Sequence, residues 1–291
     1  MTQAPPSRPG QPDRPGQPDR PEQPDRPRRR WRGGLVPLRT ALGLFTILPV
    51  RAAPEIGRDD AARAVLWLPV VGLLLSVPAA AVLLAVAAGG HSGPRRLLAA
   101  ALAMLVLALL TGGLHLDGLA DTADGLGSRR PRDEALAIMR RSDVGPFGVA
   151  ALLFTVLVQI TALATVAPGW PDAAALAVAV VTGRTAVVLA TGPGSPAARP
   201  DGFGALVAGA TSARARITAG AALLAVAATT AAAWGGYPAA RGALAVLAGL
   251  GAGDLLRRLA RRRLGGMTGD VFGAVAEVST AVALLALALT A

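Results

Sequence analysis

The sequence contains no cysteine and no lysine, and only 3% of its 291 residues are aromatic. The absence of cysteine excludes disulfide bonds and thiolate metal sites. All 29 basic residues are therefore arginine, and with 18 acidic residues they give a formal net charge of +11. A charge of this size is common in nucleic-acid-binding proteins, but the positions of the arginines explain it without a nucleic-acid partner.

Long apolar runs, in contrast, are abundant, with 53% hydrophobic residues and a mean hydropathy of +0.49. Repeated runs of about 20 residues are not expected in a soluble domain. We therefore predict an all-α, polytopic helical bundle of about seven transmembrane helices in the lipid bilayer. The predicted spans are 64–88, 97–114, 148–167, 173–190, 217–234, 242–256 and 271–291, of which the sixth is the weakest because it is short and contains Asp254.

The N-terminal region differs in composition from the rest. Residues 8–25 hold three hexads of the form Arg-Pro-x-Gln-Pro-Asp. Proline at this density prevents helix and sheet, so residues 1–32 are predicted to be a disordered Pro/Arg-rich tail. Residues 33–291 are predicted to form a single integral membrane domain. The apolar stretch 35–50 is interrupted by Arg39, which favours an interfacial or partly inserted helix.

The arginines are distributed unevenly across the predicted spans. With the N-terminus in the cytoplasm, 25 arginines fall on the cytoplasmic side and three on the far side. The positive-inside rule favours this orientation in the cell (inner) membrane. It also places the loops 115–147, 192–216 and 257–270 together in the cytoplasm.

The most informative stretch is 112–125, Gly-Gly-Leu-His-Leu-Asp-Gly-Leu-Ala-Asp-Thr-Ala-Asp-Gly. Helical spacing puts Asp117, Asp121 and Asp124 on one face, where their mutual repulsion favours a hard divalent cation. Gly118 and Gly125 leave backbone bare for a bulky anion. These features predict a metal–phosphate site.

The alternative is a solvated helix end whose acids pair with Arg129, Arg130 or Arg132. The nearby His115 either reaches a bound phosphate or lies at the interface.

Two further motifs lie on the same predicted face. In 138–148, Arg140 and Arg141 suit phosphate binding, although ordinary membrane anchoring explains them equally well. Residues 134–139 suggest a short amphipathic surface helix.

The third motif, 264–277, carries Gly-Gly-Met-Thr-Gly-Asp, which suits an anion nest at a helix start. Glu277 shares a face with Asp270 roughly 10 Å deeper. An acid at that depth indicates function, or else a structural hydrogen bond to a neighbouring helix. Arg184 in the fourth span either meets an acid or a phosphate, or extends to the interface.

Together these three motifs resemble those of the cobalamin synthase (adenosylcobinamide-GDP ribazoletransferase) family, and Phe45-Thr46-Ile47-Leu48-Pro49 is similar to its N-terminal motif. The resemblance covers about residues 35–291. The charges of Arg141 and Asp143 look exchanged relative to the family, and Thr280 stands where many members carry an acid.

The resemblance implies an integral membrane enzyme in which the 3′-hydroxyl of α-ribazole, or of its 5′-phosphate, attacks the β-phosphorus of adenosylcobinamide-GDP and releases GMP. Mg²⁺ is the implied cofactor. The expected metal ligands are Asp117, Asp121, Asp124 and Asp270, and the expected catalytic residues are Asp117, Asp121, His115 and Glu277. Substrate binding is expected from Arg140, Arg184, Thr268, Gly118 and Gly125.

Two other functions are compatible with the residues. A CDP-alcohol phosphotransferase of lipid synthesis also clusters aspartates at a membrane surface, but its longer D-G-x2-A-R…G-x3-D-x3-D pattern is not matched here. A cation- or proton-coupled transporter would use Arg184, Asp254 and Glu277, but acids gathered at one surface argue against a path through the membrane.

Overall fold

The computed structural model describes residues 35–50, 56–233 and 239–290, so the tail 1–32 lies outside the described residues. The described part is helical, and its only β pairing is a bridge between Ala197 and Met267. The all-α prediction is therefore confirmed. The helices are α1 (Val36–Phe45), α2 (Arg58–Val65), α3 (Leu68–Ala87), α4 (Gly93–Leu110), α5 (Leu114–Gly127), α6 (Arg132–Ile138), α7 (Pro146–Thr165), α8 (Trp170–Ala190), α9 (Gly202–Val207), α10 (Ala213–Ala233), α11 (Ala239–Leu264) and α12 (Gly269–Leu289).

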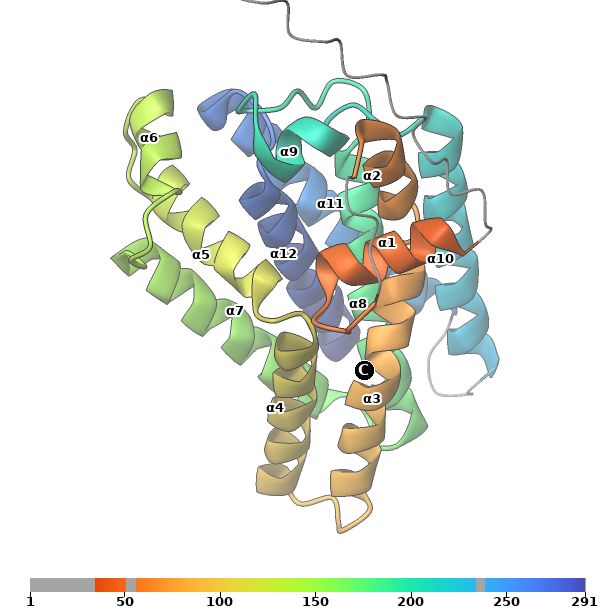
Figure 1. Cartoon of the computed structure of the whole chain (residues 1–291). Coiled ribbons are helices and arrows are strands. Elements are labelled where there is room, and N and C mark those ends of the chain that lie inside the picture. Colours follow the sequence, from red (N-terminus) through yellow and green to blue (C-terminus); the bar gives the residue numbers. More distant parts are fainter. Residues whose placement is uncertain (1–34, 51–55, 234–238, 291) are drawn as a thin grey trace, which may run out of the picture. The chain divides into compact units, whose positions relative to one another are not determined.

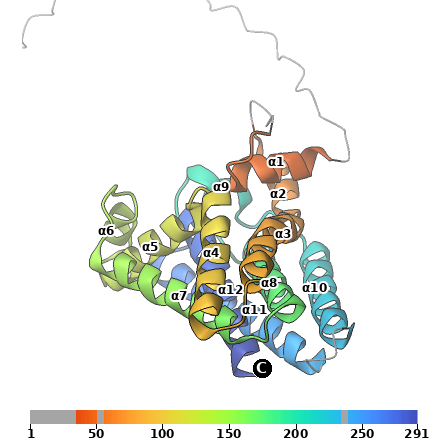
Figure 2. The same cartoon turned by 90° about the horizontal axis from the view of Figure 1, so that it is seen from below.

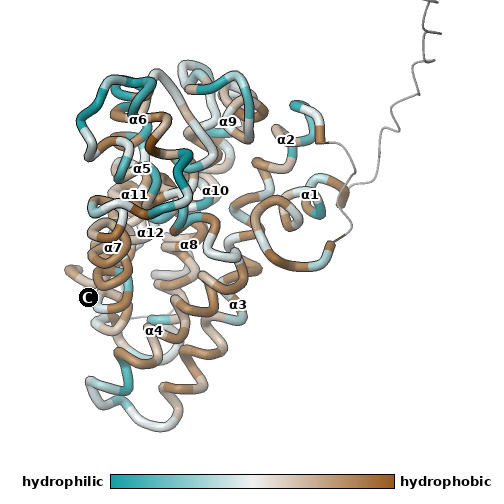
Figure 3. The backbone as a smooth tube through the Cα atoms, turned by 60° about the vertical axis from the view of Figure 1, so that its left-hand side comes forward, coloured by the Kyte–Doolittle hydropathy of each residue, from teal (hydrophilic) through white to brown (hydrophobic). Residues whose placement is uncertain are grey.

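Each predicted span coincides with a long helix, namely α3, α4, α7, α8, α10, α11 and α12. Five of these, α3, α4, α7, α8 and α12, are long and apolar enough to cross a membrane. The chain is thus a multi-pass membrane protein by helix length and composition, whereas spans at α10 and α11 stay predictions. Hydrophobic residues run along α3, α4 and α7, and hydrophilic residues concentrate around α6 and α9 (Figure 3).

Helix starts follow from proline positions. The helices α1, α3, α4, α7 and α8 each carry proline at the first or second position, where its missing N–H costs nothing and its fixed φ suits the helix. Two predicted boundaries shift for local reasons. Residues 64–65 end α2 rather than beginning α3, and Gly112 and Gly113, with φ of +60° and +74°, stop α4 before Leu114 starts α5.

The helices α8 and α12 lie among the others (Figure 2). The apolar windows of α8 and α12 are 78% and 67% buried, against 22–39% for α3, α4 and α7. Small residues allow this close packing, because Gly183 of α8 faces Ala276 and Thr280 of α12, and Gly253 of α11 faces Ser279. An acid in place of Thr280 would meet the backbone of α8 at Gly183.

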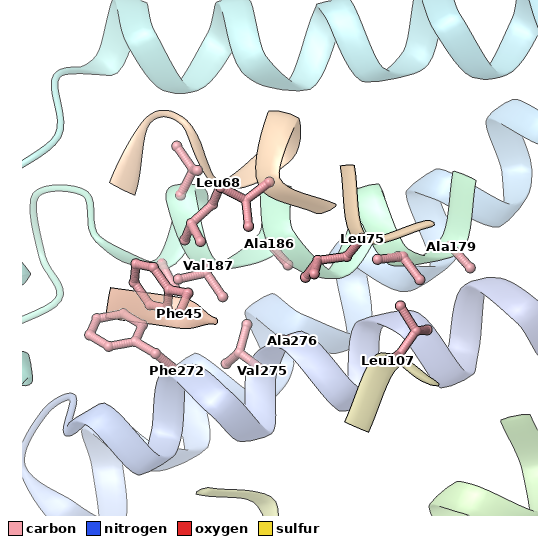
Figure 4. Packing of buried hydrophobic residues seen from close by; sticks show 14 of the residues in the cluster. Phe45, Leu68, Leu75, Leu107, Ala179, Ala186, Val187, Phe272, Val275 and Ala276 are labelled. Atoms are coloured by element: carbon pink, nitrogen blue, oxygen red, sulfur yellow. The ribbon is translucent and has the colours of Figure 1, made fainter. Parts of the chain in front are cut away.

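One hydrophobic cluster joins the short N-terminal helix to the central helices. Phe45 and Phe272 both contact Phe203 edge to face, with ring centroids 5.3 and 6.1 Å from it. Figure 4 shows Phe45 beside Phe272 and Val187, with Leu107 of α4 at the opposite end of the view. The helix α1, which is apolar but short, runs across the end of α3 (Figure 1). Its place at the membrane interface stays a prediction.

The helix α5 leaves the end of α4 at an angle and runs between α7 and α12 (Figure 1). Two glycines permit its crossing with α12. A Cβ on Gly118 would lie 2.6 Å from the carbonyl oxygen of Asp270, and a Cβ on Gly273 would lie 3.2 Å from the Cα of His115. The backbones therefore approach each other where any side chain would separate them, and the crossing brings Asp117 close to Asp270.

We expect Gly118→Ala to lower the thermal stability of the purified protein, because backbone atoms of α12 cannot yield to the new methyl group as a flexible side chain would. Overpacking of this kind costs roughly 1–3 kcal/mol. The matched control is Gly251→Ala in α11, where an added Cβ would meet no atom within 4 Å. Alanine favours helix over glycine, so the control should match or exceed the wild-type melting temperature. Equal melting temperatures for the two variants would contradict the close crossing.

Candidate functional site

The three loops predicted to share one face are joined to one another at one end of the helices. The backbone N–H of Ala198 donates to the carbonyl of Met267 at 2.9 Å, and that of Met267 donates to Pro196 at 2.8 Å. Arg132 ties the first loop to both others, since its guanidinium donates to the carbonyls of Leu264 and Ala198 at 2.9 and 2.8 Å. These bonds hold α6, the segment before α9 and the start of α12 as one assembly.

A cavity of about 490 Å³ opens where α5, α9 and the start of α12 meet. Its polar lining combines acids, arginines and exposed backbone, and its apolar lining comes from the aromatic cluster. The residues used in the following argument are His115, Asp117, Arg140, Arg199, Asp201, Phe203, Thr268, Asp270 and Gly273. Opposite charges thus face a common space that is large enough for a small-molecule group.

Three of the predicted carboxylates gather near this cavity. Asp117 is exposed and lines it, while Asp121 is half-buried one turn further along α5. Burial raises the pKa of Asp121 to about 6, and the negative charges of Asp117 and Asp270 add to the effect. The crossing of α5 and α12 thus brings Asp270 near the aspartates of α5, and their repulsion is the electrostatic condition that a cation would relieve.

Asp124 has a different environment. Its two carboxylate oxygens accept hydrogen bonds from the backbone N–H groups of Gly145 and Gly148, at 2.7 and 2.9 Å. These are N–H groups at the start of α7 that lack partners within the helix. Asp124 thus caps α7 from outside, and its role as a metal ligand stays a prediction.

Thr268 is the N-cap of α12. Its hydroxyl accepts from the N–H of Val271 and donates to the carboxylate of Asp270, both at 3.2 Å. The glycines at 118 and 125 are packing positions: Gly118 faces Asp270, and Gly125 faces the side chain of Met139. Thr268 lines the cavity, and its contact with substrate stays a prediction. Substrate binding by the two glycines also stays a prediction.

His115 is 3% exposed and stacks at 6.4 Å on the ring of Phe45. Burial, with a smaller contribution from the positive charge of Arg184, lowers its pKa well below the ordinary value. The imidazole is therefore neutral at physiological pH. Its Nδ1 is buried and has no hydrogen-bond partner in the described residues, and the residue lines the cavity.

Arg184 and Glu277 lie deeper. Arg184 is 3% exposed and packs against Gly72 of α3, so it does not extend to the interface. It interacts electrostatically with Glu277, whose Oε2 accepts from Nε2 of Gln159 at 2.9 Å. The hydrogen bond to a neighbouring helix, named above as the alternative for Glu277, is thus present. Glu277 is one turn beyond Gly273, which lines the cavity.

Two cavity residues were not identified from the sequence. Asp201 accepts from one guanidinium nitrogen of Arg140 at 2.9 and 3.1 Å, and Arg199 lies 3.9 Å from Asp270 while donating to the carbonyl of Leu136 at 2.6 Å. Both belong to a loop, 192–216, that carries no recognisable motif. The sequence pointed to this loop only by placing it on the same predicted side of the membrane as the three motifs.

The neighbouring arginines do not neutralise the aspartate cluster in the way the alternative required. Arg130 pairs with Glu134 at 3.8 Å, and Arg132 donates to the backbone carbonyls described above. Arg141 and Asp143, whose charges look exchanged relative to the family motif, form an ion pair with each other at 3.3 Å, and both side chains are exposed. The helix predicted near 134–139 is confirmed as α6.

The oxygen donors suit a hard cation such as Mg²⁺. Within residues 35–50, 56–233 and 239–290, however, no three His, Asp or Glu side chains stand close enough together to hold an ion by themselves. This fits an ion that takes one or two carboxylates from the protein and the remaining ligands from substrate phosphates and water.

A multi-pass helical bundle with carboxylates, arginines and a neutral histidine around one cavity has the composition of a membrane enzyme with its candidate active site at one end of the helices. Residues 37–288 match the family model described as cobalamin-5-phosphate synthase, and the chain belongs to this family.

Curated relatives agree. The chain is 43% identical over 268 residues to the adenosylcobinamide-GDP ribazoletransferase of Frankia casuarinae, covering 88% of this chain and 95% of that one. It is 40% identical over 254 residues to the protein of the same name from Bradyrhizobium diazoefficiens (87% and 94% covered) and 37% identical over 242 residues to that from Citrobacter koseri (82% and 93% covered). No solved structure matches.

We expect Asp124→Asn to destabilise the protein, because one of its two N–H donors would then face an amide NH₂ instead of an oxygen. Loss of a buried charged acceptor costs roughly 1–3 kcal/mol. Thermal unfolding in detergent measures the effect. An unchanged melting temperature, together with activity lost only at low Mg²⁺, would show that Asp124 binds metal rather than capping α7.

Proposed function

We propose that this chain catalyses the adenosylcobinamide-GDP ribazoletransferase reaction. The 3′-hydroxyl of α-ribazole, or of its 5′-phosphate, attacks the phosphorus that is bonded to cobinamide. The bond from that phosphorus to GMP breaks, GMP leaves, and the new phosphodiester closes the nucleotide loop of cobalamin. The observation that carries the proposal is the cavity shared by α5 and α12, found in a chain of this family.

The cavity residues have separable parts in this reaction. Arg140 and Arg199 supply positive charge for the pyrophosphate, and the exposed backbone at Gly273 lets it approach closely. Displacement of Asp201 from Arg140 would free that guanidinium for a phosphate. The neutral imidazole of His115 is able to accept the proton of the attacking hydroxyl. Glu277 lies one helical turn beyond the cavity residue Gly273 and interacts with Arg184 of α8. The two opposite charges position α8 and α12 relative to each other.

We also propose that the enzyme depends on Mg²⁺, held by one or two of the carboxylates of Asp117, Asp121 and Asp270 together with substrate phosphates and water. Bound there, the ion would neutralise charge on the transferring phosphorus and on the leaving GMP. The clustering of these carboxylates around the arginine-lined cavity supports the proposal.

The direct test uses the purified full chain in lipid nanodiscs with adenosylcobinamide-GDP, α-ribazole and Mg²⁺. The expected result is release of GMP and formation of a cobalamin product in equal amounts, dependent on both substrates. Hydrolysis to GMP without α-ribazole, or no GMP under any Mg²⁺ concentration, would overturn the proposed reaction.

Asp121→Asn tests the metal assignment. We expect turnover to fall by at least about 100-fold, comparable with removal of other charge-stabilising groups from active sites. The melting temperature should not fall, because this carboxylate already has a raised pKa and its ionised form is repelled by its neighbours. Asp133→Asn, an exposed position on α6, is the control and should retain activity. Near-normal turnover of Asp121→Asn at low Mg²⁺ would rule out ligation by this residue.

We further propose that the cavity faces the cytoplasm, on the basis of the arginine distribution. In this cysteine-free chain, Ser128→Cys supplies a single thiol at the cavity end and Ser92→Cys a single thiol in the loop between α3 and α4. A membrane-impermeant maleimide should label the Ser92 variant in intact cells, and the Ser128 variant only after lysis. The reverse pattern would invert the topology.

A further inference from the structure

A second cavity adjoins the first at Asp117. It has a volume of about 600 Å³ and is built by the segment after α1, the turn between α4 and α5, and one side of α7. It shares Leu44, Phe45, Leu114 and Asp117 with the first cavity. The two cavities therefore meet at one carboxylate and one aromatic ring.

The walls of this second cavity are held in place by the backbone. The N–H of Ile47 donates to the carbonyl of Leu110 at 2.9 Å, which joins the segment after α1 to the end of α4. Gly112 leaves room for this contact, because a Cβ there would lie 2.8 Å from the Cγ2 of Ile47. The motif Phe45–Pro49, which the reaction described above does not use, is thus what shapes the cavity.

The linings differ in chemistry. The first cavity contains Arg140, Arg199 and Asp201 as well as acids. Apart from Asp117, the side chains lining the second carry no charge, and they include Phe45, Ile47, Val144 and Leu152. A lining without arginine does not suit a pyrophosphate, whereas apolar and aromatic walls suit a flat heterocycle.

The geometry of phosphoryl transfer requires two such spaces. The attacking oxygen and the leaving oxygen lie roughly in line on opposite sides of the phosphorus. The acceptor must therefore approach from the side opposite to GMP. Two cavities that meet at Asp117, one arginine-lined and one apolar, offer a separate space to each of the two groups.

We propose that the second cavity binds the heterocyclic base of the acceptor, α-ribazole, and that Phe45, Ile47 and Leu152 determine specificity for it. Its ribose then lies toward Asp117, with the 3′-hydroxyl directed into the first cavity, where the pyrophosphate binds. This inference rests on the proposed function.

The test is a steady-state comparison of KM for the two substrates, using GMP release by the full chain in nanodiscs. Leu152→Trp fills the second cavity and should raise KM for α-ribazole by at least about tenfold, while KM for adenosylcobinamide-GDP stays within about twofold. The matched control is Leu153→Trp, the next residue of α7, which is 55% exposed and does not line the cavity. It should leave both KM values unchanged.

Two further variants keep the test decisive if Leu152→Trp does not fold. Ile47→Ala, at a 63% exposed side chain, should raise KM for α-ribazole by about tenfold, the loss expected for an aliphatic contact with substrate. Arg199→Gln in the first cavity should have the opposite effect on the two substrates: it should raise KM for adenosylcobinamide-GDP and leave KM for α-ribazole unchanged.

The outcomes separate the two proposals. If the wild-type protein releases no GMP, the proposed function fails. If the wild type is active but Leu152→Trp and Ile47→Ala leave KM for α-ribazole unchanged, the base binds elsewhere and the assignment of the second cavity is wrong. A rise in KM for adenosylcobinamide-GDP instead would mean that the assignment of the two cavities is reversed.

Discussion

The contact between α5 and α12 is the constraint on which the rest of the site depends. It requires that Gly118 and Gly273 lack side chains, because each backbone occupies the space that a Cβ on the other helix would need. At this crossing the first turns of both helices bring their acids, Asp117 and Asp270, to one cavity. Burial raises the pKa of Asp121, and the charges of Asp117 and Asp270 raise it further, so the cluster is unfavourable without a counter-charge.

The arginines around this negatively charged cluster have two roles. Arg132 donates to backbone carbonyls of two other loops and therefore holds the cavity walls together. Arg140 and Arg199 face the cavity, where each is close to an acid that a phosphate could replace. Deeper in the bundle, Arg184 lies among helices, and Glu277 with its Gln159 partner balances its charge. Positive charge thus holds the cavity walls together, and we propose that it also serves phosphate recognition and membrane orientation.

The short N-terminal helix connects these features to the membrane part of the fold. Phe45 packs edge to face on Phe203, stacks on His115 and lines both cavities. One aromatic side chain therefore supports the neutral histidine and separates the charged space from the apolar one. This arrangement explains how a residue far in sequence from the aspartates belongs to the same site.

Much of this protein was readable from sequence because the information was local. The apolar runs predicted long helices where α3, α4, α7, α8, α10, α11 and α12 occur, and the spacing of Asp117, Asp121 and Asp124 predicted one helix, α5. Spacing could not reveal that Asp124 turns to the N–H groups of α7 or that Gly118 is a packing position. Nor could it find Arg199, which lies in a loop without periodicity. Hydropathy and helical period are properties of neighbouring residues, whereas charge pairing and close backbone approach depend on which helices cross, and only the tertiary structure decides that.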